Sequence, residues 1–507
     1  MAERLFESVS AHISTSPDAV REKPSPDSPF RMLVLGDFSG RANRGVADAD
    51  ALRARRPQTI DRDNFEQVLG KLGARLGLQL FGDGGDRIDL EFASLEDFHP
   101  DRLYDRNAAF QSLRALRKRL ADPKTFADAK AEIADWTATA PPQSADAAER
   151  PAPAGGGAAL LDEMLGGGGQ TGPQSGDRQW NALLRRLVAP YVVPAADPMQ
   201  AQLTGYVDTA TGALMRAVLH DPGFQALEAA WRALWLLVRG LETGTDLKLY
   251  LLDVGKAELC GDAETAGDVR ESGLHRLLVE QAVETFGGES WSLVVGAYTF
   301  DDSAEDAAAL GRIGAIARQA GAPFIAAASP RIVGCDSLAE APDPDRWQRE
   351  QAADAPWPAL RRTPQAQSVG LLLPRFLLRL PYGASTEPIE RFVFEEMADP
   401  PQHAHYLWGN PCFACALLLG RSFSQSGWDF PSALELNVDG LPLHTYRQAG
   451  ETRIKPCAEI WLTERAANRM IECGAMPLAS LKDTDSVRLV RLQSIATPAS
   501  RLAARWN

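Results

Sequence analysis

The chain has 507 residues, more than one ordinary hydrophobic core uses, so we expect two or more domains. Its 45% hydrophobic and 24% charged residues are typical of globular proteins, and its net charge of −14 argues against a general nucleic-acid or anionic-membrane binder. The first residues contain no apolar signal core, and the most apolar run, 369–380, is interrupted by a proline and two arginines. Six cysteines without a dense framework then indicate reduced thiols and a cytoplasmic protein.

After an N-terminal arm, residues 1–29, we expect a small α/β unit at 30–136. A buried strand is predicted at 32–35 and an alternating strand at 88–92. Asp63 is placed to cap a helix whose apolar positions are Phe65, Val68, Leu69, Leu72 and Leu76. The Ser94–Asp97 spacing resembles a capping box, and a second helix is predicted by Phe110, Leu113, Leu116 and Leu120.

Residues 137–179 form an Ala/Pro/Gly-rich linker, because this composition buries too little apolar surface to offset the entropy of ordering. One apolar island, 158–165, has the spacing of a short helix with a single apolar face. That face consists of Leu160, Leu161, Met164 and Leu165. The island is either a docking motif that folds on a partner or a chance apolar patch, since so short a helix is marginal alone.

A longer α/β region is predicted at 180–507. Asp221 followed by Pro222 starts a helix in the favoured way. Further helices are predicted around 310–317 and 464–473. Strands are predicted at 247–251, 291–295, 324–328, 441–443, 454–462, 476–481 and 487–492. Alternating elements favour a mixed α/β or α+β fold.

Signals for catalysis or cofactor binding are weak. Gly36, Gly40 and Gly45 follow a strand, but their spacing fits no phosphate loop, so a simple turn is favoured. Cys412 and Cys415 have the spacing of a redox or half-zinc site, although their apolar neighbours indicate a buried helix. The pair His403 and His405 could contribute to a metal site, but no ligand cluster stands near them in the sequence. We therefore predict no catalytic residue, cofactor or metal.

Several short sequence motifs resemble those of a known protein family. Residues 33–40 (LVLGDFSG), 60–65 (IDRDNF) and 90–98 resemble the small contractile-sheath subunit of type VI secretion systems (TssB/VipA/ImpB-like). A larger number of motifs resemble the large sheath subunit (TssC/VipB/ImpC/EvpB-like). These are 221–232, TFGGE at 285–289, 322–330, LPRFLLRLPYG at 373–383, YLWGN at 406–410, 421–428 and GLPLH at 440–444. The chain thus resembles a fusion of both subunits.

The resemblance implies a structural protomer with the contractile, phage-tail-sheath-like fold. Such protomers form a helical homopolymer around an inner (Hcp-like) tube on a baseplate and contract to drive the tube outward. An AAA+ unfoldase (ClpV-like) recycles the sheath, and the island at 160–165 resembles the helix that the unfoldase recognises. A separate small subunit is a further possible partner. The assembly is bacterial and stands on a membrane-anchored apparatus.

The family also exchanges terminal strands between neighbours. Candidate donors are the N-terminal arm, through Val9, Ala11 and Ile13, and the C-terminal segment, through Val487, Leu489, Arg491 and Gln493. The arm could equally be a helix, with Leu5, Val9 and Ile13 on one side. Two other functions stay open at this point. One is a non-polymerising adaptor, baseplate or regulatory paralogue with the same fold; the other is a metal or redox enzyme using Cys412 and Cys415.

Overall fold

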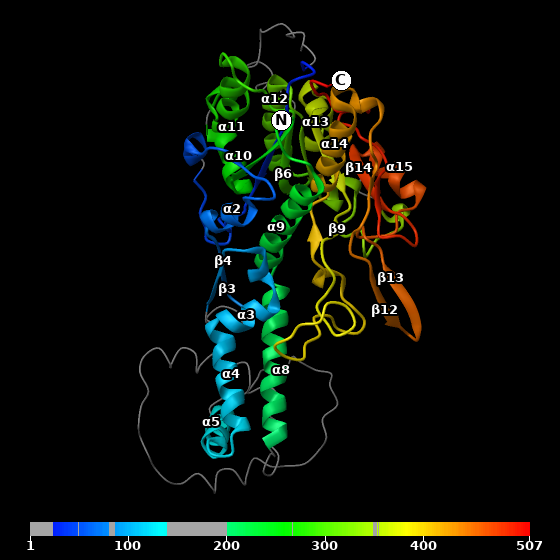
Figure 1. The fold of residues 1–507 in the computed structure, drawn as a ribbon. Coiled ribbons are helices and arrows are strands. Elements are labelled where there is room, and N and C mark those ends of the chain that lie inside the picture. The colour runs from blue at the N-terminus through cyan, green and yellow to red at the C-terminus, as the bar shows by residue number, and fades with distance from the viewer. Residues whose placement is uncertain are drawn as a thin grey trace.

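The computed structural model of the protein describes residues 24–48, 50–80, 87–138, 200–265, 267–347, 352 and 354–506. A nine-stranded mixed sheet forms the body, in the order β11-β15-β14-β8-β7-β6-β1-β5-β2 (Figure 1). The six strands from β14 to β5 are parallel, and β15, β11 and β2 are added by antiparallel pairing. In chain order the nine strands are β1 (Phe30–Gly36), β2 (Gln58–Thr59), β5 (Leu247–Asp253), β6 (Leu293–Phe300), β7 (Phe324–Ala328), β8 (Val369–Leu373), β11 (Asn437–Val438), β14 (Ala475–Ser480) and β15 (Val487–Leu489).

The strand β1 lies between β5 and β6, more than two hundred residues away in sequence, and pairs in parallel with both. Its side chains alternate between two cores. Met32 and Val34 belong to the cluster on one face of the sheet, and Leu33 and Leu35 to the cluster on the other. This burial on both faces is typical of parallel sheets. The portion before the linker therefore contributes a central strand to the body of the portion after it.

Helices cover both faces of this sheet. The first face packs against α9 (Pro222–Gly240) and α14 (Cys412–Ser426). The opposite face packs against α10 (Lys256–Thr265), α12 (Ala304–Ala320), α13 (Pro356–Arg361), α15 (Glu464–Glu472), and α11 (Gly273–His275) with the π-helix Arg276–Glu284 that continues it. In the part of the chain that the structure describes, no helix is long and apolar enough to cross a membrane.

A helical stalk extends from one end of the sheet (Figure 1). It consists of α3 (Pro100–Arg106), α4 (Ala108–Ala121), α5 (Phe126–Ala138) and α8 (Gln200–Leu219). The apolar side of α4 faces α8, and Arg117 of α4 donates to Asp208 of α8 at 2.5 Å. The stalk thus joins helices from before and after the linker. A further helix, α2 (Phe65–Leu72), packs beside the body.

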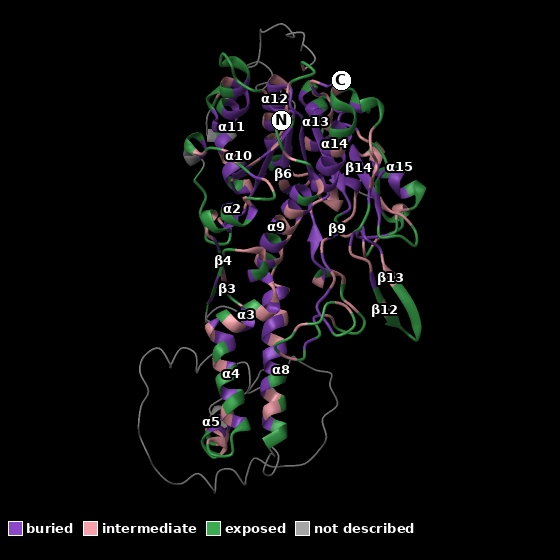
Figure 2. Cartoon of the chain, in the orientation of Figure 1, coloured by how far each residue is buried: buried purple, intermediate pink, exposed green. Residues whose placement is uncertain are grey.

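Three two-stranded sheets complete the fold. They are β3 (Ala74–Leu78) with β4 (Ile88–Phe92), β9 (Phe376–Leu377) with β10 (Trp408–Gly409), and β12 (His444–Gln448) with β13 (Glu451–Lys455). The β12–β13 hairpin projects from the body, and most of its residues are exposed (Figure 2). Short 3-10 helices lie at Asp50–Ala54, Leu95–Phe98, Val269–Glu271, Pro330–Val333, Pro344–Arg346, Pro364–Ser368, His403–His405 and Gly427–Ser432.

The mixed α/β class and most predicted elements are confirmed, with four local corrections. The helix after residue 63 ends at Leu72, because Gly73 turns the chain at a φ of 61°, and Leu76 lies in β3 instead. Asn64, not Asp63, precedes that helix, and its side chain makes no cap. Residues 441–443 form no strand. The strand predicted at 454–462 ends at Lys455, where Pro456 removes a backbone donor.

Candidate functional site

The crevice beyond the carboxyl ends of β1 and β5 is the first place to look for a ligand site. Open parallel sheets bind ligands where the strand order reverses. That reversal falls at β1, because the later strands continue on both of its sides. Here the Asp253 carboxylate is used internally: it accepts from the Phe38 and Ser39 amides at 2.8 and 3.0 Å and from the Ser39 hydroxyl at 2.7 Å.

Glu258, at the start of α10, fills the rest of this crevice. Its carboxylate is 1% exposed and accepts from Arg41 at 2.7 and 2.8 Å and from Arg55 at 2.6 Å. It also accepts from the Gly255 amide at 2.8 Å. Burial alone would raise the pKa of Glu258, but these hydrogen bonds hold it well below its ordinary value. The fold's usual ligand position is thus closed by ion pairs between the two portions of the chain.

The glycine-rich turn after β1 serves this closure. Gly40 has a φ of 74°, and a Cβ there would lie 2.2 Å from the Arg75 carbonyl oxygen, so the position requires glycine. The neighbouring Ser39 carbonyl accepts from the Arg75 amide of β3 at 3.2 Å. A simple turn therefore explains Gly36, Gly40 and Gly45, and no phosphate-binding loop is needed to account for them.

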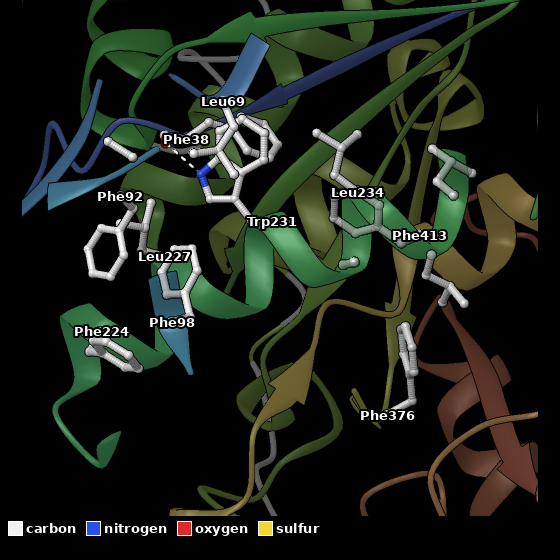
Figure 3. Packing of buried hydrophobic residues seen from close by; sticks show 14 of the residues in the cluster. Phe38, Leu69, Phe92, Phe98, Phe224, Leu227, Trp231, Leu234, Phe376 and Phe413 are labelled. Atoms are coloured by element: carbon white, nitrogen blue, oxygen red, sulfur yellow. Dashed lines mark hydrogen bonds between the residues drawn. The ribbon is translucent and has the colours of Figure 1, made fainter. Parts of the chain in front are cut away.

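An aromatic cluster joins the two portions below the sheet (Figure 3). Trp231 of α9 is fully buried, and its indole donates to the Phe38 carbonyl at 2.8 Å. Phe38 and Phe65 meet its ring edge-on, at 5.3 and 5.6 Å between centroids. Phe224, two turns before Trp231 on α9, packs against Phe98 at 5.7 Å. Such pairs add to the apolar burial that holds the portions together.

A buried charge network fixes the segment after β9 onto α9. Arg379 lies between two fully buried carboxylates, with Glu228 at 2.9 Å and Glu396 at 2.7 Å. Glu396 also accepts from the Tyr382 amide at 2.7 Å, and Arg232 donates to Glu228 at 2.7 Å. Burial would lower the pKa of Arg379, but the two carboxylates raise it well above its ordinary value. The sequence contained no pattern that pairs these distant charges.

The four candidate redox or metal residues do not come together. Cys412 and Cys415 are buried in α14, as predicted, and burial raises the pKa of Cys415 to about 12. His403 lies between Glu459, at 3.0 Å, and the Lys455 amine, at 2.7 Å. His405 instead stacks on His220, with 3.8 Å between the ring centroids. Among the described residues, no group of three or more His, Cys, Asp or Glu side chains could hold a metal ion.

The structure describes only some of the segments that are candidates for assembly contacts. Val9, Ala11 and Ile13, and the island Leu160, Leu161, Met164 and Leu165, lie outside the described residues. Val487 and Leu489 belong to β15, which pairs with β14 and β11 of the same chain and buries both side chains. Arg491 is exposed, and Gln493 donates to the carbonyls of Ile471 and Ala475 at 2.9 and 3.2 Å. In this structure the C-terminal segment thus completes its own chain's sheet.

The β12–β13 hairpin is largely exposed, and His444 is its one buried residue. Its two ends are held at the body: the Tyr406 hydroxyl is 2.7 Å from His444 Nδ1, and Lys455 contacts His403. Its turn has positive φ at Ala449 (52°) and Gly450 (83°), which matches the twist of a tight hairpin. The hairpin is thus a fixed projection, a feature that suits contacts between molecules rather than catalysis.

The fold is one body built from two portions of the chain, and ion pairs fill the crevice at the point where the strand order reverses. Two family models match the chain: the EvpB tail sheath N-terminal domain (VipB) at residues 202–496, and the type VI secretion system VipA family at 12–138. The chain belongs to the family of type VI secretion sheath proteins, a structural and non-enzymatic family, and fuses VipA/TssB-like and VipB/TssC-like domains.

Two curated relatives come from Pseudomonas aeruginosa. The type VI secretion system sheath protein TssC1 is 36% identical over 305 residues, 58% of this chain and 60% of that protein. The sheath protein TssB1 is 30% identical over 106 residues, 20% of this chain and 60% of that protein. The chain therefore spans about three fifths of each relative that it matches.

Proposed function

We propose that this chain is a protomer of a contractile type VI secretion sheath, which polymerises around an inner tube and contracts to drive that tube outward. The observation that carries the proposal is the insertion of β1, from the VipA-like domain, between β5 and β6 of the VipB-like domain. One polypeptide thereby supplies both sheath components in a fixed one-to-one ratio and at high effective concentration.

Electron microscopy of the purified full chain, alone and with an inner-tube protein, tests this function. Long tubes are the expected result, since a head-to-tail interface that does not close generates a helical polymer. Discrete particles under every assembly condition would favour the other candidate, a non-polymerising adaptor or baseplate paralogue. The exposed, fixed β12–β13 hairpin favours the polymer, because it offers two open strand edges to a neighbour.

We further propose the partners and place of such a sheath. The N-terminal arm, 1–29, donates a strand to a neighbouring protomer. The protomer assembles with an inner-tube protein on a baseplate, with or without a separate small subunit, in the bacterial cytoplasm. The proposed division of the chain is an arm, a VipA-like domain at 30–136, a linker at 137–179 and a VipB-like domain at 180–507.

The linker island is proposed as a docking helix for the recycling AAA+ unfoldase. Its apolar residues provide one face for a hydrophobic groove. Replacing Leu161 and Met164 together with Asp is expected to abolish unfoldase binding, measured by fluorescence anisotropy with the full chain. Matched replacement of Asp162 and Glu163 by Asn and Gln leaves the apolar face intact and should preserve binding. Equal affinity of the first variant and the wild type would remove the island from this role.

A further inference from the structure

The β12–β13 hairpin has one face that lies largely open in the part of the chain that the structure describes. Because opposite residues of the pair share a face, Thr445, Arg447, Thr452 and Ile454 lie together on it. The other face carries His444 and Lys455, which contact the body. Ile454 belongs to none of the core clusters formed by the described residues. An isolated two-stranded hairpin is marginally stable in water, so this face is suited to a partner.

The charge of the hairpin indicates what that partner is. The hairpin carries three cationic residues and one anionic residue on a chain whose net charge is −14. Arg447 is exposed and makes no ion pair within the part of the chain that the structure describes, whereas Arg453 is paired with Glu451 at 2.8 Å. An arginine without an ion pair beside an isoleucine is complementary to a surface that combines a carboxylate with an apolar side chain.

The segment 383–400 of the same chain has such a surface. Val393 is 98% exposed, the flanking Phe392 and Phe394 pack inward, and Glu387 and Glu390 are exposed. Neither carboxylate forms an ion pair among the described residues. The segment is also held in place: the Asp101 carboxylate of α3 accepts from the amides of Glu390 and Arg391 at 3.1 and 3.0 Å. It is therefore a preformed surface, and Figure 1 shows it as the yellow loop beside the stalk.

We propose that the open face of the β12–β13 hairpin docks on segment 383–400 of a second copy of this chain, with Arg447 against Glu390 and Ile454 against Val393. The two surfaces differ, so the contact is heterologous and can repeat from copy to copy without closing. This inference rests on the proposed sheath function and assigns one of its interfaces. Charge complementarity fixes the register of the contact and steers the encounter.

Charge reversal tests the pairing. Arg447→Glu and Glu390→Arg are each expected to raise the protein concentration needed for assembly by about tenfold or more. Mixing the two variants should restore assembly, because reversed hairpins then meet reversed segments on alternate copies. Lys124→Glu, on the exposed turn between α4 and α5, is the control for the change in net charge that Arg447→Glu makes. Normal assembly of either variant alone would overturn the inference. So would a mixture that needs as high a protein concentration for assembly as each variant alone.

Disulfide crosslinking separates this interface from the sheath function. A copy with Arg447→Cys and a differently tagged copy with Glu390→Cys are mixed and oxidised. We expect a crosslinked dimer that carries both tags, and no crosslinked dimer when either variant is oxidised alone. Wild-type tubes without this crosslink would overturn the interface and leave the sheath function standing. The crosslink without tubes would keep the interface and overturn the sheath function. Neither tubes nor crosslink would overturn both.

Discussion

At the scale of single residues, Glu258 of the VipB-like domain forms ion pairs across the boundary between the two family domains. Its buried carboxylate binds Arg41 and Arg55 of the VipA-like domain. Glu258→Gln keeps the shape and removes the charge, which leaves Arg55 without its carboxylate and Arg41 with only the longer ion pair to Asp253, at 3.9 Å. We expect a loss of about 3 kcal/mol in the free energy of unfolding, measured by urea titration.

The matched control is Glu91→Gln. Glu91 pairs with Arg75 at 3.4 Å, but both side chains are largely exposed, at 74% and 59%. Exposed pairs contribute little, so this variant should stay within about 0.5 kcal/mol of the wild type. Equal, small effects of both substitutions would show that the Glu258 cluster is not a clamp.

Glu459 gives a prediction about pH. Burial would raise its pKa, but hydrogen bonds from His403 and Arg375 lower it from the ordinary value of 4.5 to about 2. A lowered pKa contributes stability above pH 4.5 that is lost as the pH falls toward 2. The free energy of unfolding of the wild type should therefore exceed that of Glu459→Gln by about 2 kcal/mol at pH 7. The two curves of unfolding free energy against pH should converge near pH 2. Parallel curves over this range would contradict the assignment.

Residue roles could be predicted from the sequence where they are local. Asp221 accepts from the amides of Gly223 and Phe224, and Asp97 closes the capping box with Ser94, both as predicted from neighbouring residues. The Glu258 cluster could not be predicted in this way, because its partners are about two hundred residues apart and meet only through the sheet.

At the scale of elements, periodicity identified the amphipathic helices and alternating strands. It missed α8, whose buried positions include Ala, Thr and Gly, small residues that carry little apolar signal. It also failed for β8, a fully apolar run of five residues, because a strand buried on both faces shows no alternation. Where apolar residues continue past a glycine or proline, as at Gly73 and Pro456, the predicted elements were too long.

The helix α14 gives a prediction about thiol chemistry. Burial raises the pKa of Cys415 to about 12 and that of Cys412 well above its ordinary value, so neither thiolate forms near neutral pH. Iodoacetamide at pH 8 should leave both residues unmodified in the native chain and label them after denaturation, as measured by mass spectrometry. Burial also raises the pKa of Cys335, to about 11, but this thiol is partly exposed, so it serves as the internal comparison for accessibility and should be labelled faster than the two buried thiols. Rapid native labelling of Cys412 or Cys415 would be inconsistent with this packing.

At the scale of the whole molecule, the two domains form one body because β1, the stalk and the Trp231 cluster all cross between them. A protease site introduced into the linker, between residues 139 and 179, should therefore allow cleavage without separation of the two fragments. We expect both fragments to elute together at the position of the intact chain in gel filtration. An uncut chain treated identically is the control, and separate elution under native conditions would contradict the shared sheet.

The sequence could not predict this arrangement. Composition and periodicity place a boundary at the linker, but they do not determine which strands pair across it. The residues of β1 look the same for a strand in a small separate sheet or in the centre of a large one. Only the register of Met32 beside Leu249 and Leu293 distinguishes the two.

The central position of β1 has a consequence for synthesis on the ribosome. Residues 30–36 leave the exit tunnel early, whereas β6, its second neighbour, ends at residue 300. At about 5–20 residues per second, translation of the intervening roughly 260 residues takes about 13–50 seconds. For most of that interval, until β5 is complete at residue 253, this apolar strand lacks both of its neighbours. The nascent chain is therefore a natural client for cotranslational chaperones, because its first strand waits through a longer stretch of synthesis for its second neighbour than any other strand of the nine-stranded sheet.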